Sequence, residues 1–246
     1  MVETLLYAGC TLQFVDIDTQ TLCLDWKQAI ALAKDACAIL FVHTYGVEDD
    51  YSDSFATARK ENPLIAIIDD RCLCFPCLDL VQTEADLVLY STGEKKQVDF
   101  GVGAIGYVTD GWKYEDIKVT DNAILKNEIW IPNKAVIEKK MDEVISHKEK
   151  LNAIYRRSLS KHLECLPDSY QHWRFHIIVP NKGEVLNAIF DAGLFASGHY
   201  ALQGRDSPIA ANLYANVINL FNDFYYTKEQ AQKTCDVILG VMQRNR

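Results

Sequence analysis

Short apolar runs alternate with segments of helical spacing between residues 11 and 108, and this alternation is the feature that most restricts the fold. Apolar runs of about four to eight residues are typical of strands buried on both faces of a parallel sheet. We expect strands at 11–17, 37–42, 64–68, 85–90 and 103–108, with helices at 25–36 and 52–61. Parallel strands joined through helices form right-handed crossovers. The pattern therefore predicts an α/β fold with a mostly parallel sheet flanked by helices.

The rest of the chain has a different pattern. Residues 131–159 are charged and have helical spacing, residues 173–179 resemble a strand, and residues 183–192 and 227–242 resemble helices. Elements in this order are typical of an α+β unit. We therefore expect a large-domain portion at residues 1–130, followed by a linking helix and a C-terminal small domain at residues 131–246.

Composition argues against several classes of partner. The formal net charge is −9, which disfavours binding to nucleic acid or to an anionic membrane, because both attract basic patches. No apolar run reaches the ~18 residues that a membrane-spanning helix needs, and the N-terminus lacks the features of a secretion signal. We expect a cytoplasmic protein. The eight cysteines lack the spacing of a metal site, so we predict no metal and interpret them as small buried side chains.

Polar side chains follow the expected strands at the points where the strands end. His43 and Tyr45 follow the second expected strand, Asp70 follows the third, Ser91 follows the fourth, and Lys96 lies five residues after Ser91. Active sites of parallel sheets gather beyond the carboxyl ends of the strands. Each residue also has a simpler interpretation as the first solvated residue after a buried strand. Their order along consecutive strands favours a shared site.

The combination of amine, carboxylate and hydroxyl fits the chemistry of pyridoxal 5'-phosphate (PLP). A neutral lysine amine forms an imine with an aldehyde. A carboxylate that faces a pyridinium nitrogen keeps the ring protonated, which makes the ring an electron sink. Lys96 and Asp70 match these two roles, and the hydroxyl of Ser91 is suited to a phosphate. The alternative is that Lys96 and its neighbour Lys95 form an exposed surface pair.

Four ordered pieces of the sequence resemble the DegT/StrS-type nucleotide-sugar aminotransferases, which are PLP-dependent enzymes of fold type I. The pieces are AGCTLQFVDIDTQTLCLD, FVHTYG, IIDD and STGEKKQVDFGVGA. The third is similar to the family's Ile-Glu-Asp and places the pyridine-binding aspartate on Asp70. In the fourth, Ser91, Lys96 and Gly101 keep the family's spacing of serine, Schiff-base lysine and glycine turn. This spacing selects the second of the two adjacent lysines.

The resemblance implies a PLP-dependent aminotransferase in which Lys96 forms the internal aldimine and acts as general acid and base. It implies that Asp70 holds the pyridinium and that Ser91 helps to hold the phosphate, while His43 and Tyr45 line the substrate site. The implied substrates are a nucleotide-linked keto-sugar and glutamate. The implied setting is polysaccharide biosynthesis, and the implied assembly is a homodimer or a complementing subunit.

The sequence also departs from the family. The family residues that precede the first matching piece, which carry a phosphate-binding turn, have no counterpart here. Leu73 replaces the family's Gln or His, and Thr92, Val102 and Ala104 replace residues of the serine and glycine motifs. Two alternatives therefore stay open. One is a truncated, catalytically impaired relative or a partner subunit that needs a separate N-terminal segment, and the other is a non-PLP α/β binding protein.

Overall fold

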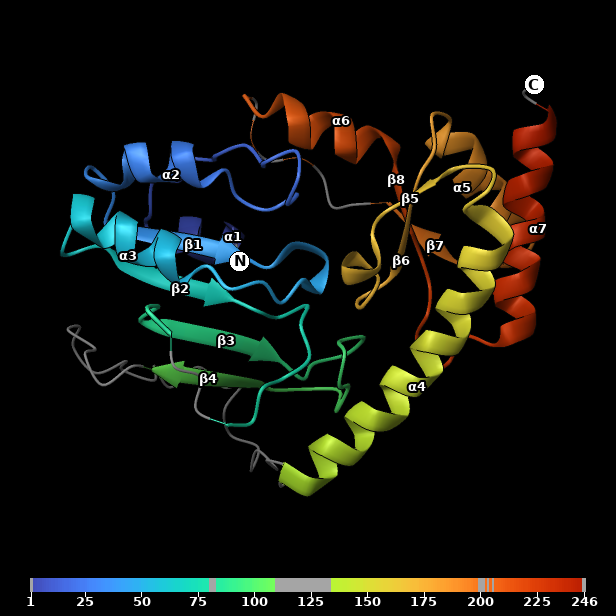
Figure 1. Ribbon diagram of the computed structural model, residues 1–246, viewed down its shortest axis with the longest axis horizontal. Coiled ribbons are helices and arrows are strands. Elements are labelled where there is room, and N and C mark those ends of the chain that lie inside the picture. The colour runs from blue at the N-terminus through green and yellow to red at the C-terminus, as the bar shows by residue number, and fades with distance from the viewer. Residues whose placement is uncertain are drawn as a thin grey trace.

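The computed structural model describes residues 2–79, 83–108, 134–198, 202, 204 and 206–244. They form two units, each built on a four-stranded sheet (Figure 1). The first sheet has the order β1-β2-β3-β4, made of β1 (Ala38–Val42), β2 (Ala66–Asp70), β3 (Leu87–Ser91) and β4 (Ala104–Val108). β1, β2 and β3 are parallel, and β4 is antiparallel to β3. The predicted α/β class with a mostly parallel sheet is confirmed.

Two helices cover one face of the first sheet (Figure 1). α2 (Trp26–Ala33) begins after Asp25, whose side chain accepts hydrogen bonds from the amides of Lys27 and Gln28, as an N-cap residue does. α3 (Ser52–Glu61) follows β1. Alternate strand residues face these helices and form a buried core with them, which includes Ala33, Ile39, Phe41, Phe55, Ala58, Ile67, Val88 and Tyr90. The core fixes the strand register, because a shift by one residue would turn these side chains to the other face.

Three short elements complete the first unit. The helix α1 (Val2–Tyr7) has no buried residue. A single helical turn, η1 (Thr44–Gly46), follows β1. Gly46 has a φ of 76°, and a Cβ there would lie 2.4 Å from the carbonyl oxygen of Leu73, so the turn and the segment after β2 pack too closely for any larger residue.

The predicted strand at residues 11–17 is wrong, because the segment has no regular structure apart from one isolated bridge. Its polar groups contact the second unit instead. The carboxylate of Asp16 accepts hydrogen bonds from the amides of Ile209 and Ala210, each at 3.0 Å, in the first turn of α6 (Pro208–Asn216). A carboxylate is well placed at a helix N-terminus, where amides lack partners within the helix. This contact attaches the segment to the second unit.

The second unit is an antiparallel sheet covered by helices, which agrees with the predicted α+β class, although the sequence predicted only one of its strands. Its order is β5-β6-β8-β7, made of β5 (Glu164–Cys165), β6 (Phe175–Ile178), β7 (Ala196–Ser197) and β8 (Val217–Leu220). α5 (Lys182–Asp191) and α7 (Lys228–Arg244) contribute to a core that includes Phe175, Ile177, Val185, Ile189, Ile218, Leu220 and Ile238. A short turn, η3 (Asp168–Tyr170), precedes β6. The predicted domain boundary at residues 130 and 131 lies outside the described residues.

The helix α4 (Lys134–Leu159) joins the two units. It is 26 residues long and runs from beside the first sheet to the second (Figure 1). Its buried side chains are Ile137, Val144, Lys148, Leu151, Tyr155 and Leu159, at the spacing of one helix face. Lys148 is the one charged member of this stripe. Neither α4 nor any other helix of the described residues is long and apolar enough to cross a membrane.

The cysteines differ in their surroundings. The prediction that they are buried is confirmed for Cys23, Cys74 and Cys235 and is wrong for Cys10 and Cys37, which are exposed. The other three cysteines are half-buried.

Candidate active site

Asp70 and Ser91 lie at the carboxyl ends of neighbouring strands, on the same face of the first sheet. Asp70 is the last residue of β2, and Ser91 is the last residue of β3. The register pairs Asp70 with Leu89, and residues two apart in a strand share a face, so Ser91 lies on the side of Asp70. Lys96 lies in the loop that connects β3 with β4. The structure therefore brings the three residues to one edge of the sheet, where the active sites of α/β proteins form.

Asp70 lies beside Cys72. Asp70 is 8% exposed, and its carboxylate accepts a hydrogen bond of 2.9 Å from the amide of Cys72. Burial raises the pKa of the Cys72 thiol to about 12, a hydrogen bond with Asp70 adds to this rise, and the charge of Lys96 opposes it. The charges of Asp70 and of Lys96 thus have opposite effects on the pKa of this thiol.

Asp69 faces the opposite side of β2 and is fully buried. One of its carboxylate oxygens lies 2.8 Å from Nε2 of His43, and the other accepts a hydrogen bond of 2.7 Å from Nε of Arg71. The remaining ring nitrogen of His43 contacts the carbonyl oxygen of Val47 at 2.6 Å, and it must be the donor because a carbonyl only accepts. Asp69 is thus engaged in the protein interior, whereas Asp70 lies at the site edge.

His43 and Tyr45 are fully buried. Tyr45 has a φ of 63°, and its ring packs against the rings of His176 and Tyr170, with centroids 4.4 and 6.2 Å apart. Burial raises the pKa of Tyr45 above its ordinary value. Tyr45 therefore belongs to the packing between the two units, and His43 belongs to the Asp69 contact. Their predicted role in lining a substrate site stays a prediction.

The half-buried Lys96 lines a cavity of about 90 Å³ between its loop and α4. Lys95 and Gln97 from the loop, and Lys140 and Lys148 from α4, also line this cavity. The side chain of Lys95 is 71% exposed. Lys148 further lines a second, larger cavity of about 550 Å³, which is bounded by both units. A volume of this size is in the range of small-molecule sites.

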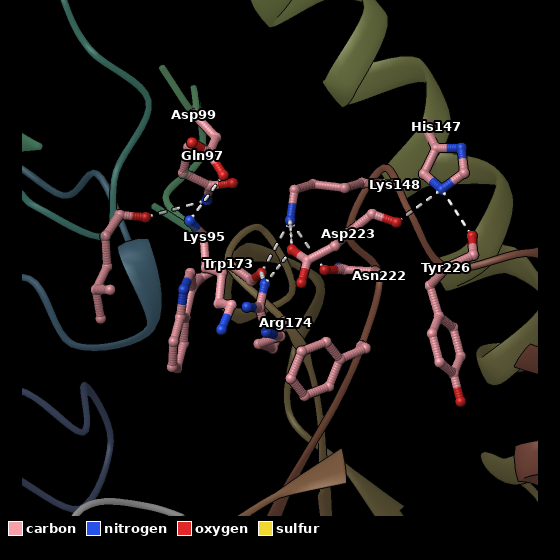
Figure 2. A network of polar contacts seen from close by, with 12 residues as sticks. Lys95, Gln97, Asp99, His147, Lys148, Trp173, Arg174, Asn222, Asp223 and Tyr226 are labelled. Carbon is pink, nitrogen blue, oxygen red and sulfur yellow. Dashed lines mark hydrogen bonds and ion pairs between the residues drawn. The ribbon is translucent and has the colours of Figure 1, made fainter. Parts of the chain in front are cut away.

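Lys148 is the centre of a polar network that sequence reasoning missed (Figure 2). Its Nζ donates hydrogen bonds of 2.9 Å to the carbonyl oxygen of Trp173 and to Oδ1 of Asn222, and lies 4.0 Å from Asp223. Arg174 forms an ion pair of 2.5 Å with the same carboxylate. Burial lowers the pKa of Lys148 to about 7, and the charge of Arg174 adds to this effect. A lysine on the apolar stripe of a helix is the sequence signal that points to such a group.

The stability of the protein should therefore depend on the charge of Lys148. The pKa of Lys148 is about 7 in the folded state, whereas its ordinary value is 10.5. Between these two pH values the unfolded chain binds more protons than the folded protein. The free energy of unfolding therefore rises with pH in this range. From pH 7 to about 9, we expect the wild type to gain about 2 kcal/mol in the free energy of unfolding relative to Lys148→Met. Urea unfolding at both pH values measures this difference.

The control for this measurement is Lys139→Met, which replaces an exposed lysine of the same helix. The same pH dependence in the wild type and in Lys148→Met would show that the buried amine does not titrate in this range.

Part of the chain is similar to a known family. Residues 1–78 match the model of the DegT/DnrJ/EryC1/StrS aminotransferase family. The resemblance inferred from the sequence motifs is thus confirmed. The range matched to the family includes His43, Tyr45 and Asp70, while Ser91 and Lys96 follow it. Among curated proteins, none matches the chain.

Solved structures share the fold over nearly the whole chain. The sugar aminotransferase CalS13 from Micromonospora echinospora is similar with a TM-score of 0.74 at 16% identity, over 96% of this chain and 76% of that one. The PLP form of the sugar aminotransferase Spr1654 from Streptococcus pneumoniae gives a TM-score of 0.75 at 14% identity, over 99% of this chain and 78% of that one. The GDP-4-keto-6-deoxy-D-mannose-3-dehydratase of E. coli, with bound hydrated PLP, gives a TM-score of 0.67 at 16% identity, over 95% of this chain and 75% of that one. At these identities the likeness establishes the fold alone.

Proposed function

We propose that this chain is a PLP-dependent sugar aminotransferase in which Lys96 is the residue that binds the cofactor covalently. The observation that carries the proposal is the convergence of Asp70, Ser91 and Lys96 at one sheet edge, in a chain whose residues 1–78 match the aminotransferase family. The fold shared with CalS13 and with the PLP form of Spr1654 supports it.

The donor set fits PLP. A half-buried amine suits the aldehyde, and the buried carboxylate of Asp70 suits a protonated ring nitrogen. Ser91 Oγ accepts a hydrogen bond of 3.3 Å from the amide of Gly93, so the hydroxyl proton is free to turn to another acceptor, such as a phosphate oxygen. Each of the three functional parts of the cofactor therefore has a chemically matched partner in this chain.

The three residues would divide the work between them. PLP, when bound, supplies an electron sink for the electrons of a broken substrate C–H bond. Lys96 would hold the aldehyde carbon and, once released from it, move a proton at the substrate carbon. Asp70 would keep the proton on the ring nitrogen through its negative charge, and Ser91 would donate a hydrogen bond to the phosphate.

The substrate class follows from the relatives. We infer a nucleotide-linked keto-sugar as the amino acceptor and glutamate as the donor, in the cytoplasm and in polysaccharide biosynthesis. The similar fold of an E. coli dehydratase of a GDP-linked keto-sugar supports the sugar class and makes dehydration a second candidate reaction. We also infer a homodimer, which light scattering of the purified protein distinguishes from a monomer, or alternatively a complementing second subunit.

The decisive experiment maps the lysine that binds PLP. Purified protein is mixed with PLP, scanned for an absorbance band near the visible edge, reduced with borohydride and cleaved for peptide mass spectrometry. We expect one adduct on Lys96 in the wild type and in the matched variant Lys95→Ala, and none in Lys96→Ala. No adduct at saturating PLP would refute cofactor binding by this chain alone and would favour an impaired relative or a subunit that needs a partner.

A further inference from the structure

The loop that carries Lys96 is closed by main-chain hydrogen bonds. It spans residues 92–103, between β3 and β4. The amide of Thr92 donates to the carbonyl oxygen of Gly103 at 3.1 Å, and the amide of Phe100 donates to the carbonyl oxygen of Thr92 at 2.9 Å. Two adjacent lysines, Lys95 and Lys96, lie within this closed loop. Both lysines line the cavity between the loop and α4, but Lys95 is exposed and Lys96 is half-buried, so the backbone conformation of the loop sets how each amine is presented.

Asp99 connects the two sides of the loop. Oδ2 of its carboxylate accepts a hydrogen bond of 2.8 Å from the amide of Lys95, and Oδ1 accepts one of 2.7 Å from the amide of Gly101. Lys95 has a φ of 62°, a left-handed conformation that residues with a Cβ rarely adopt. The hydrogen bond from its amide therefore holds the residue directly before Lys96 in a conformation that it would otherwise leave.

Further contacts fix the loop from outside. Nζ of Lys140 on α4 donates to the carbonyl oxygen of Asp99 and lies 4.5 Å from the ring centroid of Phe100. The side-chain amide of Gln97 donates to the carbonyl oxygen of Leu73 at 3.0 Å, and Gln97 is 2% exposed. Figure 2 shows the Asp99 and Gln97 contacts, and both residues line the same cavity as Lys148. The backbone is thus held on both sides of Lys96.

We propose that Asp99 is a positioning residue that selects Lys96, and not Lys95, as the amine that faces the site. The proposal rests on the proposed role of Lys96. Without the carboxylate, Lys95 returns to a negative φ, which rotates the following peptide and changes the directions of both lysine side chains. The exposed Lys95 side chain, paired with Glu94 at 3.4 Å, then competes with Lys96 for an aldehyde.

The first test needs no PLP. Limiting formaldehyde and borohydride methylate accessible lysine amines, and mass spectrometry of fragments from cleavage at acidic residues gives the rate for each lysine. We expect Lys95 to react several-fold faster than Lys96 in the wild type, and the ratio to approach one in Asp99→Ala. The matched control is Asp18→Ala, because Asp18 also accepts from two main-chain amides, those of Gln20 and Thr21. The control should keep the wild-type ratio.

The second test uses PLP with borohydride trapping. We expect the wild type and Asp18→Ala to carry the adduct on Lys96, and Asp99→Ala to divide it between Lys96 and Lys95. Adding Lys95→Gly to Asp99→Ala should restore the wild-type methylation rate of Lys96, because glycine adopts positive φ freely. If Asp99→Ala does not fold, Asp99→Asn replaces it, keeps one of the two acceptor oxygens and should give an intermediate ratio.

The two tests separate the two proposals. An unchanged Lys95 to Lys96 methylation ratio in Asp99→Ala overturns the role of Asp99, whatever happens with PLP. A changed ratio together with no PLP adduct in the wild type refutes the proposed function and leaves the role of Asp99 in orienting the lysines standing.

Discussion

Replacing Lys96 by Ala is expected to lower the rate of amino transfer by at least about 10²–10⁴-fold, the range for loss of a general acid–base group. In the proposed function Lys96 also forms the covalent link to the cofactor, so the true loss should exceed this range. The rate is measured as release of 2-oxoglutarate from glutamate in a single turnover of the PLP-loaded protein. Lys95→Ala is the control, because its lysine is exposed, and it should keep most of the activity.

Chemical rescue makes this prediction more specific. A small primary amine such as ethylamine can replace the missing amine of Lys96→Ala, because truncation leaves space in the cavity between the loop and α4. We expect added ethylamine to restore part of the rate in Lys96→Ala and to leave the rates of the wild type and of Lys95→Ala unchanged. Equal losses in the two lysine variants would contradict the assignment of Lys96.

Replacing Asp69 by Ala is expected to destabilise the fold by about 3–5 kcal/mol, as the loss of one partner from a buried ion pair does. Asp69 is fully buried between His43 and Arg71. Removing it leaves the Nε2 of a fully buried imidazole and the Nε–H of a largely buried guanidinium without the acceptor that they face. The free energy of unfolding is measured by urea titration at neutral pH.

The control for Asp69 is the exposed pair of Asp79 and Lys134, whose side chains are 82% and 50% exposed. Asp79→Ala should cost less than about 1 kcal/mol, because an exposed ion pair contributes little. A loss in Asp69→Ala no larger than that in Asp79→Ala would show that water replaces the missing carboxylate. Asp69→Asn should fall between the two, since it retains an acceptor oxygen without the charge.

The alternation of apolar runs was sufficient to predict the sheet of the first unit and the order of its site residues. It worked because a strand buried on both faces is mostly apolar, so that polar residues such as Asp70 and Ser91 stand out where β2 and β3 end. The pattern could not predict that β4 runs antiparallel to β3, because burial does not depend on strand direction. It failed at residues 11–17, where β-forming residues find no neighbouring strand and Asp16 binds a distant helix instead.

The contacts around the site were harder to predict. Asp99 acts through hydrogen bonds to main-chain amides within its loop, and a loop aspartate has many other roles that look the same in sequence. The partners of Lys148 come from segments 25 and 74 residues away along the chain, so only the folded arrangement reveals them. The distinction between Asp69 and Asp70 depends on which face of β2 is covered, which in turn depends on where α2 and α3 pack.

The two hydrogen bonds of Asp16 have a consequence for synthesis of the protein on the ribosome. Their donors lie 193 and 194 residues further along the chain, and Tyr170 reaches back in the same way to the carbonyl oxygen of Thr21 at 2.8 Å. Strands β1 to β4 emerge early and can assemble as a unit. The segment that precedes them must wait for α6, which is translated long after β4. Residues 11–24 therefore gain these contacts only after α6 has been made, and ribosome-bound chains that stop before α6 should leave residues 11–24 open to protease.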